Sequence, residues 1–589
     1  MAQLARSAPP SGSSGPSAQP GALWTAIVAV LTDAGVEVIF GLPDDDQRVL
    51  RAVTAAGIRF VICRDQRNAV FAATGYAMTA DRLGVAVVGR GPAVTNTLTG
   101  LLEARSSAVP LLLFAGGTPA RSLGSGAFQE LDQVSVVRSL VTHAERVEHP
   151  ERVVAALRRA LLIASNGRPG PVYLEIPDHL FDAAVSEGHA GLELDNAAGE
   201  PMTTAAPRAW EMVNAAARPL ILVGGGMRHR NRDRAVEHLA ERLDAALTCT
   251  ASGRGVLDED HPQFLGLSGL YAAEASRPLW ATTDCVVALG SRLEETATFG
   301  WSPAIGAEVP VIQVNIDVAD IATTFGGCCV PGDAGAVVRS WNAAAATLRT
   351  STAVDRTAWR ATVCEARDNI LATPRVRAGN TTAHGRIDVR AVLRVLQEEI
   401  PPSRVLVQEN GLQDMWSYFF PAYSCGRAGG SIVPSEQTSL GFGAAAAIGV
   451  QVAAANRPVV ALIGDGAFGM LGHDLVTAAE EAPGLLYVVL DNGGYGWCQN
   501  NVDQYPDIAH RFHFAADRRI GTLTGGAANV HIVRVESEDG LLAGIRQAWQ
   551  QCRRQRTSVL VVPVDRADGP LAGTPIAGAF PAVDQAGTS

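Results

Sequence analysis

Two apolar runs in the C-terminal third of the chain constrain its fold more than any other feature. The first, Pro458–Ile463, leads into a Gly-Asp-Gly turn at Asp465, and the second, Leu485–Leu490, leads into an Asn-Gly-Gly turn at Asn492. The segment Met470–Glu481 between them predicts a crossover helix. The runs are therefore expected to be neighbouring parallel strands whose carboxyl ends lie at one edge of a sheet, where ligands bind in open α/β folds.

The side chains at these two strand ends predict a site for a hard cation. Asp465 and Asn492 are 27 positions apart and bring a carboxylate and an amide oxygen to one point. The neighbouring glycines leave backbone carbonyls accessible there. Oxygen ligands of this kind suit Mg²⁺, which commonly holds a phosphate group as well. Two ordinary polar turns of a βαβ unit are the alternative interpretation.

Strands alternate with helices along the whole chain, which favours three α/β domains built on doubly wound parallel sheets. Linkers rich in Gly, Ala and Thr separate them. The expected limits are a disordered tail over 1–20, domains over 21–185, 208–348 and 386–566, and a loose tail over 567–589.

Composition excludes several function classes. The net charge of −11 argues against nucleic acid as a partner. All 48 basic residues are arginine, so no Schiff-base or P-loop lysine exists. The nine cysteines form no C-x-x-C pair, which fits a reducing cytoplasm and no zinc site. The uncharged stretch Gln437–Asn456 is interrupted by polar residues and predicts a buried interface helix rather than a membrane span.

Several short motifs extend this pattern. They are Gly41-Leu-Pro43, Gly91-Pro-Ala-Val-Thr-Asn96, Ala127-Phe-Gln-Glu130, Gly411-Leu-Gln413 and Leu440-Gly-Phe-Gly443. On these motifs the chain resembles the thiamine diphosphate (ThDP) decarboxylase superfamily, and within it the acetolactate synthase-like branch. The resemblance implies a pyrimidine-binding domain, a central domain and a diphosphate-binding domain, in that order. It also implies a homodimer or homotetramer whose active sites lie between chains.

The resemblance assigns roles to single residues. Asp465 and Asn492 would bind Mg²⁺ through their side chains and Gly494 through its carbonyl. Leu440 would press ThDP into its bent form, although a plain core leucine is an alternative. The other implied cofactor contacts are Pro43, Gln66, Asn96, Gly411, Gln413, Gly464, Gly466, Ala467 and Tyr495.

One position departs from the family pattern at the reacting end of the cofactor. The family places a glutamate nine residues before a Gly-Tyr-Ala sequence, and here Gly75 opens that sequence while position 66 is Gln66. Glutamine can hydrogen-bond the aminopyrimidine but cannot exchange a proton with it. Such acid–base contacts are worth ~10²–10⁴-fold in rate. Four explanations stay open: slower cofactor activation in a reaction limited elsewhere, replacement by Asp65, a binder without turnover, or a local misalignment.

Other departures separate the chain from acetolactate synthase itself. Thr142 stands where the branch has a lysine, and Gln499 lies in a segment that differs from the branch near its acceptor. Arg90 replaces a small residue; it would either grip a substrate carboxylate or pair with the acidic cluster Asp44–Asp46.

The central domain carries only part of a flavin signature. Gly290–Thr296 resembles the flavin-contacting segment, but Thr296 replaces its final arginine. The triple glycine Gly224–Gly226 is not a G-x-G-x-x-G, and Asp317 would be the ribose contact. These features favour a protein without FAD.

The sequence therefore predicts a cytoplasmic, ThDP- and Mg²⁺-dependent enzyme of specialised metabolism. It would decarboxylate a 2-oxo acid such as pyruvate and transfer the acyl unit to an acceptor carbonyl. Phe128, Gln129 and Gln499 are the predicted acceptor pocket, and no membrane partner is expected. The alternatives are a lyase or hydrolase of an acyloin, dione or acyl-CoA, and a non-catalytic ThDP-binding subunit.

Overall fold

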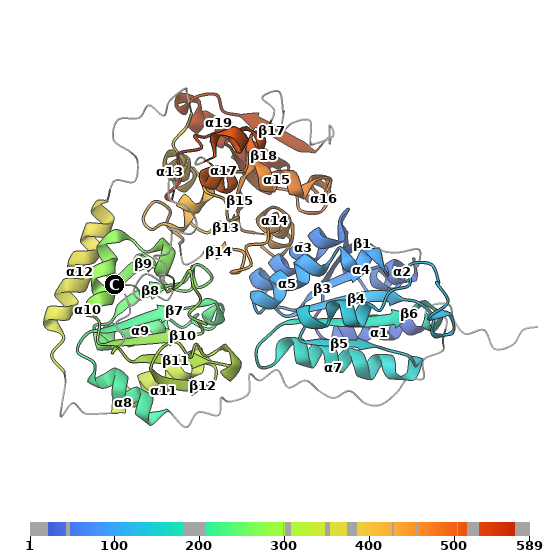
Figure 1. Cartoon of the computed structure of the whole chain (residues 1–589), viewed down its shortest axis with the longest axis horizontal. Helices are drawn as coiled ribbons and strands as arrows, with labels where there is room; N and C mark the ends of the chain where they lie inside the picture. Colours follow the sequence, from blue (N-terminus) through green and yellow to red (C-terminus); the bar gives the residue numbers. More distant parts are fainter. Residues whose placement is uncertain are drawn as a thin grey trace, which may run out of the picture.

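The computed structural model describes most of the chain as three α/β domains (Figure 1). The described residues are 22–42, 47–181, 183, 206–298, 300, 308–347, 354–373, 386–426, 429–454, 456–502, 505–514 and 529–571. Pro43, the Asp44–Asp46 cluster, the expected tail 1–20 and residues 572–589 of the expected tail 567–589 lie outside them.

The first domain is a six-stranded parallel sheet in the order β2-β1-β3-β4-β6-β5. Its four inner strands are mostly buried apolar runs, as expected where helices cover both faces, whereas the two edge strands are partly exposed. The strands are β1 (Val38–Leu42), β2 (Arg59–Ile62), β3 (Gly84–Val88), β4 (Leu111–Gly117), β5 (His143–Arg146) and β6 (Pro171–Pro177). The helices are α1 (Ala22–Asp33), α2 (Arg48–Ala55), α3 (Gln66–Ala80), α4 (Pro92–Thr95), α5 (Leu98–Ser106), α6 (Gln133–Val137) and α7 (Val153–Ser165).

The central domain is also a six-stranded parallel sheet, but its strand order, β12-β11-β10-β7-β8-β9, differs from that of the first domain. The strands are β7 (Pro219–Val223), β8 (Ala246–Cys249), β9 (Phe264–Leu267), β10 (Cys285–Leu289), β11 (Val311–Asn315) and β12 (Gly327–Pro331). The helices are α8 (Pro207–Ala215), α9 (Ala235–Leu243), α10 (Arg277–Thr282), α11 (Ala334–Thr347) and α12 (Thr357–Ala372), with a 3-10 turn η8 (Val318–Asp320) after β11.

The third domain has the order β14-β13-β15-β16-β18-β17. The strands are β13 (Val405–Gln408), β14 (Gly430–Ile432), β15 (Val459–Gly464), β16 (Leu486–Asp491), β17 (Val530–Arg534) and β18 (Thr557–Pro563). The helices are α13 (Val389–Glu399), α14 (Phe442–Ala453), α15 (Asp465–Leu471), α16 (Asp474–Glu481), α17 (Gly496–Val502), α18 (Pro506–Ala509) and α19 (Glu538–Arg553), with the 3-10 helix η9 (Asp414–Tyr418) after β13.

The three parallel sheets confirm the predicted fold class, and β15 and β16 are neighbouring parallel strands as expected. The single crossover helix expected over Met470–Glu481 was wrong. The segment is divided between α15 and α16, because Gly472 takes a φ of +56° and ends the first helix.

The first and third domains meet along α3 and α14, which lie side by side at the centre of Figure 1. Ala444–Ala447 of α14 are fully buried, and Phe71 packs edge-on against Phe442 with ring centroids 5.5 Å apart. The uncharged stretch is therefore an interface helix, as predicted. Within the described residues, no helix combines the length and apolar character needed to cross a membrane.

Candidate active site

The carboxyl edge of the third sheet collects the predicted metal ligands. Asp465 follows β15 and Asn492 follows β16, and both side chains are buried. Oδ1 of Asp465 accepts a hydrogen bond from the Gly466 amide at 3.0 Å. Oδ1 of Asn492 accepts one from the Gly494 amide at 2.9 Å, and its Nδ2 donates to Oε1 of Gln413 at 2.7 Å. The structure thus brings five of the predicted residues to one edge.

Arg566, which sequence reasoning missed, closes this edge from the neighbouring strand end. Its Nε donates to the Asn492 carbonyl at 2.8 Å and its guanidinium also donates to the Gly493 carbonyl at 3.0 Å. Its own carbonyl accepts from Nε2 of Gln413 at 2.8 Å. The rule that polar residues after parallel strands line the ligand edge applies equally to β18 and would have found Arg566.

Two buried carboxyl groups, also missed from the sequence, lie beneath the edge. Burial raises the pKa of Asp414 to about 7. Burial, and then the nearby Asp414 charge, raise the pKa of Glu409 well above its usual value, although Glu409 accepts a hydrogen bond from the Gly443 amide at 3.0 Å. A Cβ added to Gly411 would lie only 2.5 Å from Oδ1 of Asp414, so a larger residue here would have to displace the Asp414 carboxyl group. Because two buried negative charges repel each other, the Asp414 and Glu409 carboxyl groups favour a state in which at least one of them keeps its proton.

Apolar side chains stand exposed beside the same edge. Leu440 is 48% exposed, which rules out its being a plain core leucine in this chain. Tyr495 is 41% exposed and its ring meets Phe514 edge-on, with centroids 4.9 Å apart. A Cβ added to Gly466 would lie 3.0 Å from the Tyr495 ring, so glycine leaves a narrow space there, next to Ala467 and Gly464.

Gln66 and Asn96 of the first domain lie in hydrogen-bonding contact. Gln66 is the first residue of α3, and its Oε1 accepts a hydrogen bond from Nδ2 of Asn96 at 3.0 Å. Asp65 caps the same helix: its Oδ1 accepts from the amides of Arg67 at 2.8 Å and Asn68 at 3.2 Å. One oxygen of the Asp65 carboxylate is therefore engaged by the backbone as a helix cap, and Gln66 is the next side chain at this helix start.

The predicted acceptor residues lie on two domains. In the first domain, Gln129 has a φ of +58° and its carbonyl would lie 2.7 Å from a Cβ on Gly91, so the two loops approach closely. The adjacent Phe128 is 73% exposed. Gln499 belongs to α17 of the third domain, and its buried Oε1 accepts no hydrogen bond from the described residues.

Contacts at the start of α3 show how the first and third domains are arranged within one chain. Arg67 donates to the Met470 carbonyl at 3.0 Å, and Asn68 donates to the Leu471 carbonyl at 3.2 Å. These carbonyls belong to the end of α15 opposite Asp465. At about 1.5 Å of rise per residue, Met470 lies roughly 7 Å along the helix axis from Asp465. The Gln66 end of α3 is thus held at the far end of α15.

Arg90 has a partner that the sequence analysis did not consider. Its guanidinium forms an ion pair with Asp178, which follows β6. Neither predicted role is tested by this ion pair, because Asp44–Asp46 lie outside the described residues, so both roles stay predictions. The pairing is long-range in sequence, and strand order brings the ends of β3 and β6 to the same edge.

The residues of the partial flavin signature are used for internal contacts. Gly224 and Gly226 pack against Gly290, where a Cβ on either would clash with the Gly290 backbone. Asp317 caps η8 by accepting from the Ala319 amide at 2.9 Å. Thr296 donates its hydroxyl hydrogen to Glu436. The absence of FAD stays a prediction.

The edge of the third sheet fits a magnesium-bound diphosphate. Its donor set is a carboxylate, an amide and backbone carbonyls, the hard oxygens that Mg²⁺ selects. The described residues hold no cluster of three or more His, Cys, Asp or Glu. A metal site in that part of the chain therefore depends on such a mixed set. The space at Gly466 and the exposed Leu440 and Tyr495 leave room for an organic group beside it.

Comparison with protein families gives the class of protein. Residues 23–136 match the N-terminal TPP-binding domain of thiamine pyrophosphate enzymes, residues 207–340 their central domain and residues 410–562 their C-terminal TPP-binding domain. Together with the three sheets and the edge at Asp465, these matches place the chain in the family of thiamine pyrophosphate (ThDP) enzymes, in its acetolactate synthase-like branch.

Similar proteins are acetolactate synthases. The chain is 28% identical to a probable acetolactate synthase large subunit of Methanocaldococcus jannaschii, over 80% of each chain. It is 29% identical to the acetolactate synthase isozyme 2 large subunit of Escherichia coli, over 81% of this chain and 83% of that one. It is 28% identical to an acetolactate synthase of Mycobacterium bovis, over 80% and 76%. The protein is a ThDP-dependent enzyme of the carboligase or lyase class.

Proposed function

We propose that this enzyme is a Mg²⁺-dependent carboligase of specialised metabolism. It decarboxylates a 2-oxo acid such as pyruvate and transfers the acyl unit to an acceptor carbonyl. The observation that carries the proposal is the buried pair Asp465 and Asn492, held at neighbouring strand ends of the domain that matches the C-terminal TPP-binding model.

The proposed roles at this edge follow from the hydrogen bonds around it. Asp465 and Asn492 hold Mg²⁺ through side-chain oxygens and Gly494 through its carbonyl. Gln413 and Arg566 fix Asn492 in place, since Asn492 donates to the Gln413 side chain and its carbonyl accepts from Arg566. The backbone of Gly411–Gln413 and of Gly466–Ala467 lines the diphosphate. Bound ThDP supplies an electron sink for carbanion chemistry next to a carbonyl.

Gln66 orients the aminopyrimidine end without exchanging a proton there. Because Asn96 donates to Oε1 of Gln66, the Gln66 amide presents its NH₂ group as a donor. Asp65 does not take over the missing carboxylate, because its oxygen accepts two backbone amides. Proton transfer at this end is therefore slower than in family members with glutamate, and another step limits turnover.

The acceptor end is formed by Phe128, Gln129 and Gln499. The exposed Phe128 ring supplies apolar surface, and Oε1 of Gln499, which has no hydrogen-bond partner among the described residues, accepts a hydrogen bond from the acceptor. These three residues come from two domains, as expected where an active site lies between domains.

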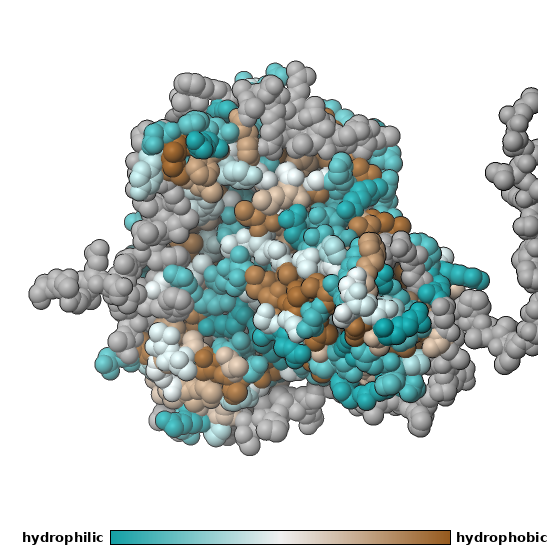
Figure 2. Space-filling view, turned by 45° about the vertical axis from the view of Figure 1, so that its right-hand side comes forward, coloured by the Kyte–Doolittle hydropathy of each residue, from teal (hydrophilic) through white to brown (hydrophobic). Residues whose placement is uncertain are grey.

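A complete site is proposed to need two chains. In one chain, Arg67 holds the Gln66 end of α3 at the far end of α15 from Asp465. A second chain would bring its own Gln66 to this Asp465. Figure 2 shows apolar residues gathered in a patch near the centre of one face, and a patch of this kind is suited to contact with another chain. We propose a homodimer or a homotetramer built from it, acting in the cytoplasm.

A lyase that cleaves a preformed acyloin, dione or acyl-CoA is the second candidate. Gln66 supports this second candidate, because cleaving a preformed substrate requires proton transfers that differ from those of ligation. The two candidates differ in the direction of the C–C bond change and not in the cofactor site.

Proton NMR of the purified protein with Mg²⁺, ThDP and pyruvate tests the proposal. We expect the pyruvate methyl signal to fall while acetolactate or acetoin signals appear. The matched control is Asp465→Asn, which should show neither change. Pyruvate that stays unchanged while ThDP binding is demonstrated would overturn pyruvate ligation and favour the lyase.

A further inference from the structure

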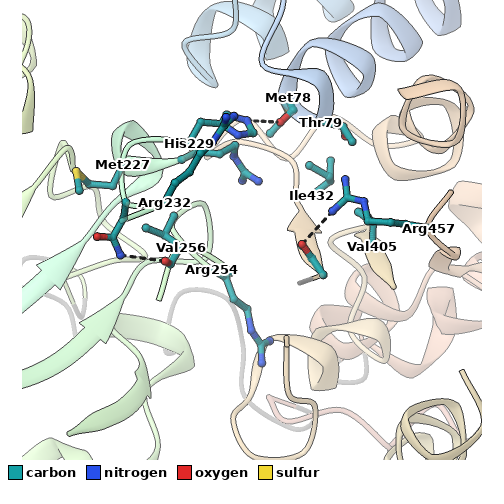
Figure 3. A pocket seen from close by; sticks show the side chains of 15 residues that line it. Met78, Thr79, Met227, His229, Arg232, Arg254, Val256, Val405, Ile432 and Arg457 are labelled. Carbon is teal, nitrogen blue, oxygen red and sulfur yellow. Dashed lines mark hydrogen bonds between the residues drawn. The ribbon is translucent and has the colours of Figure 1, made fainter. Parts of the chain in front are cut away.

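We propose that a cavity where the three domains meet is a binding site for a small phosphate-bearing anion, separate from the ThDP site. The cavity has a volume of about 340 Å³ (Figure 3). Its walls come from the last residues of α3, the loop after β7 and the starts of β13 and β14. Arg457, two residues before β15, completes it. The cavity therefore lies at the amino-terminal edge of the third sheet, whereas Asp465 and Asn492 lie at its carboxyl edge.

The charge of the lining has one sign. Four arginines and a histidine line the cavity, and none of the described residues that line it is Asp or Glu. The basic residues are Arg228, His229, Arg232, Arg254 and Arg457. In a protein with a net charge of −11, this concentration of arginines is a local feature that attracts anions, whereas burial lowers the pKa of His229 and favours its neutral form.

Two of these arginines are neutralised by the protein itself. Arg254 forms a buried ion pair with Glu259, with Nε–Oε1 at 2.7 Å. Arg232 forms an exposed pair with Asp81 at 3.1 Å. The acidic partners balance the charges of Arg254 and Arg232, so these two arginines shape the cavity but add little net attraction for an anion.

Arg228 and Arg457 lack such partners among the described residues. The Arg228 guanidinium donates to the carbonyls of Ser431 and Ser252, both at 2.9 Å. Arg457 donates to the Gly429 carbonyl at 3.2 Å. Carbonyl oxygens satisfy hydrogen bonds but carry no net charge. Burial lowers the pKa of both arginines, to about 10 for Arg228. A lowered pKa is the expected effect of burying a cation away from water without a carboxylate partner.

The two cations lie along the same strand. Arg228 of the central domain reaches Ser431 in β14, and Arg457 of the third domain reaches Gly429 just before it. One ligand placed over this strand start can meet both guanidinium groups. Two guanidinium groups bonded to alternate residues at one strand start match a phosphate better than a single carboxylate, because phosphate offers several oxygens and up to two charges.

The remaining walls fit a small ligand. Gly255, Gly429 and Gly430 have no side chains, so backbone can approach the ligand closely there. The side chains of Val256, Val405 and Ile432 supply an apolar surface that strengthens electrostatic attraction by excluding water. A volume of about 340 Å³ lies near the lower end of small-molecule sites, which suits phosphate, diphosphate or a small phosphate ester.

Isothermal titration with inorganic pyrophosphate tests this site. The protein is first saturated with Mg²⁺ and ThDP, so that pyrophosphate cannot occupy the diphosphate position of the cofactor. We expect one further site per chain, and we expect Arg228→Gln and Arg457→Gln each to weaken binding at least tenfold. Arg394→Gln is the matched control, because Arg394 is an exposed arginine of α13 paired with Glu398.

The result that overturns the proposal is the absence of pyrophosphate binding to the saturated protein, or binding that both cavity variants leave unchanged. A rise in melting temperature with pyrophosphate, lost in Arg457→Gln, gives a second readout if Arg228→Gln does not fold. Titration with inorganic phosphate separates the sources: equal affinity identifies a site for free phosphate, and tighter pyrophosphate binding identifies one for a larger phosphate ligand.

Discussion

Gln66 is the residue on which the chemistry of this enzyme depends most. It is the residue predicted to stand in place of the family glutamate; it begins α3, and its Oε1 accepts a hydrogen bond from Asn96 at 3.0 Å. The neighbouring Asp65 is committed to capping the helix. A glutamine in this setting can donate and accept hydrogen bonds but cannot relay a proton.

Restoring the carboxylate tests whether Gln66 is a specialised feature. We expect Gln66→Glu not to raise kcat for the native reaction, because turnover is limited by a later step that the carboxylate does not serve. Steady-state kinetics with the identified substrates measures this. A rise in kcat of roughly tenfold or more, within the range typical of acid–base contacts, would show instead that Gln66 reflects a loss of catalytic function.

Substitution of Asp465 tests the proposed metal site. We expect Asp465→Asn to weaken Mg²⁺-dependent ThDP binding by about tenfold or more, since the change removes the one acidic side chain among the three proposed ligands. Fluorescence titration with ThDP at fixed Mg²⁺ measures this. Asp539→Asn in the first turn of α19 is the control and should bind ThDP normally.

Asp414 gives the protein a pH-dependent stability. Its pKa rises from a usual 3.8 to about 7 in the folded protein, so the folded state binds the proton more tightly than the unfolded state. The contribution to the free energy of unfolding is therefore present in full below about pH 4 and is lost as the pH rises to about 7. We expect Asp414→Asn, which mimics the protonated form, to exceed the wild type in stability by a smaller margin near pH 5 than near pH 8.

At about pH 8 the same variant should be more stable than the wild type by more than about 1 kcal/mol, since one pKa unit corresponds to about 1.4 kcal/mol. Urea unfolding of the cofactor-free protein at the two pH values measures the difference. Equal stability at both values would show that Asp414 ionises normally.

At the scale of elements, the crossing of α3 and α14 joins the two cofactor-binding domains. The two helices approach closely because each has a glycine that faces the backbone of the other. A Cβ on Gly449 would clash with the Ala72 carbonyl, and a Cβ on Gly75 would clash with the Ala446 carbonyl. These clashes involve backbone atoms, which cannot rotate away.

We expect Gly449→Ala to destabilise the protein by about 1–3 kcal/mol or more, as overpacking of a close contact does. Thermal unfolding measures the loss. Gly540→Ala is the matched control, because Gly540 lies in α19 and a Cβ there would meet its nearest atom only at 3.8 Å. That variant should be neutral or more stable, since alanine is the better helix former. Similar effects for both variants would refute the close crossing.

At the scale of the whole molecule, the proposal that each site draws on two chains can be tested by complementation. Gln66→Ala and Asp465→Asn each remove one contributor. If the two residues of a site come from different chains, a hybrid dimer of the two variants has one intact site and one doubly altered site.

Random pairing of the two co-expressed variants should therefore restore about a quarter of wild-type activity. Each variant alone should be inactive or nearly so. Activity measurement on the purified mixture, with hybrids identified by two different affinity tags, gives the result. A mixture no more active than the variants alone would show that both residues of a site belong to one chain.

The sequence alone predicted the fold class, the neighbouring strands β15 and β16, and the edge that carries Asp465 and Asn492. These features follow from local signals. A buried parallel strand is a continuous apolar run, and the carboxyl ends of parallel strands must meet at one edge. The resemblance to ThDP enzymes added the roles of single residues and drew attention to Gln66.

Only the tertiary structure decided the contacts between distant segments. Arg566 holds the Asn492 turn, Arg90 pairs with Asp178, and Asp65 is occupied as a helix cap. The phosphate-sized cavity takes its walls from three domains. Charge and hydrogen-bond partners of this kind leave no periodicity in the sequence, because they depend on which strand and helix ends the folded sheets bring together.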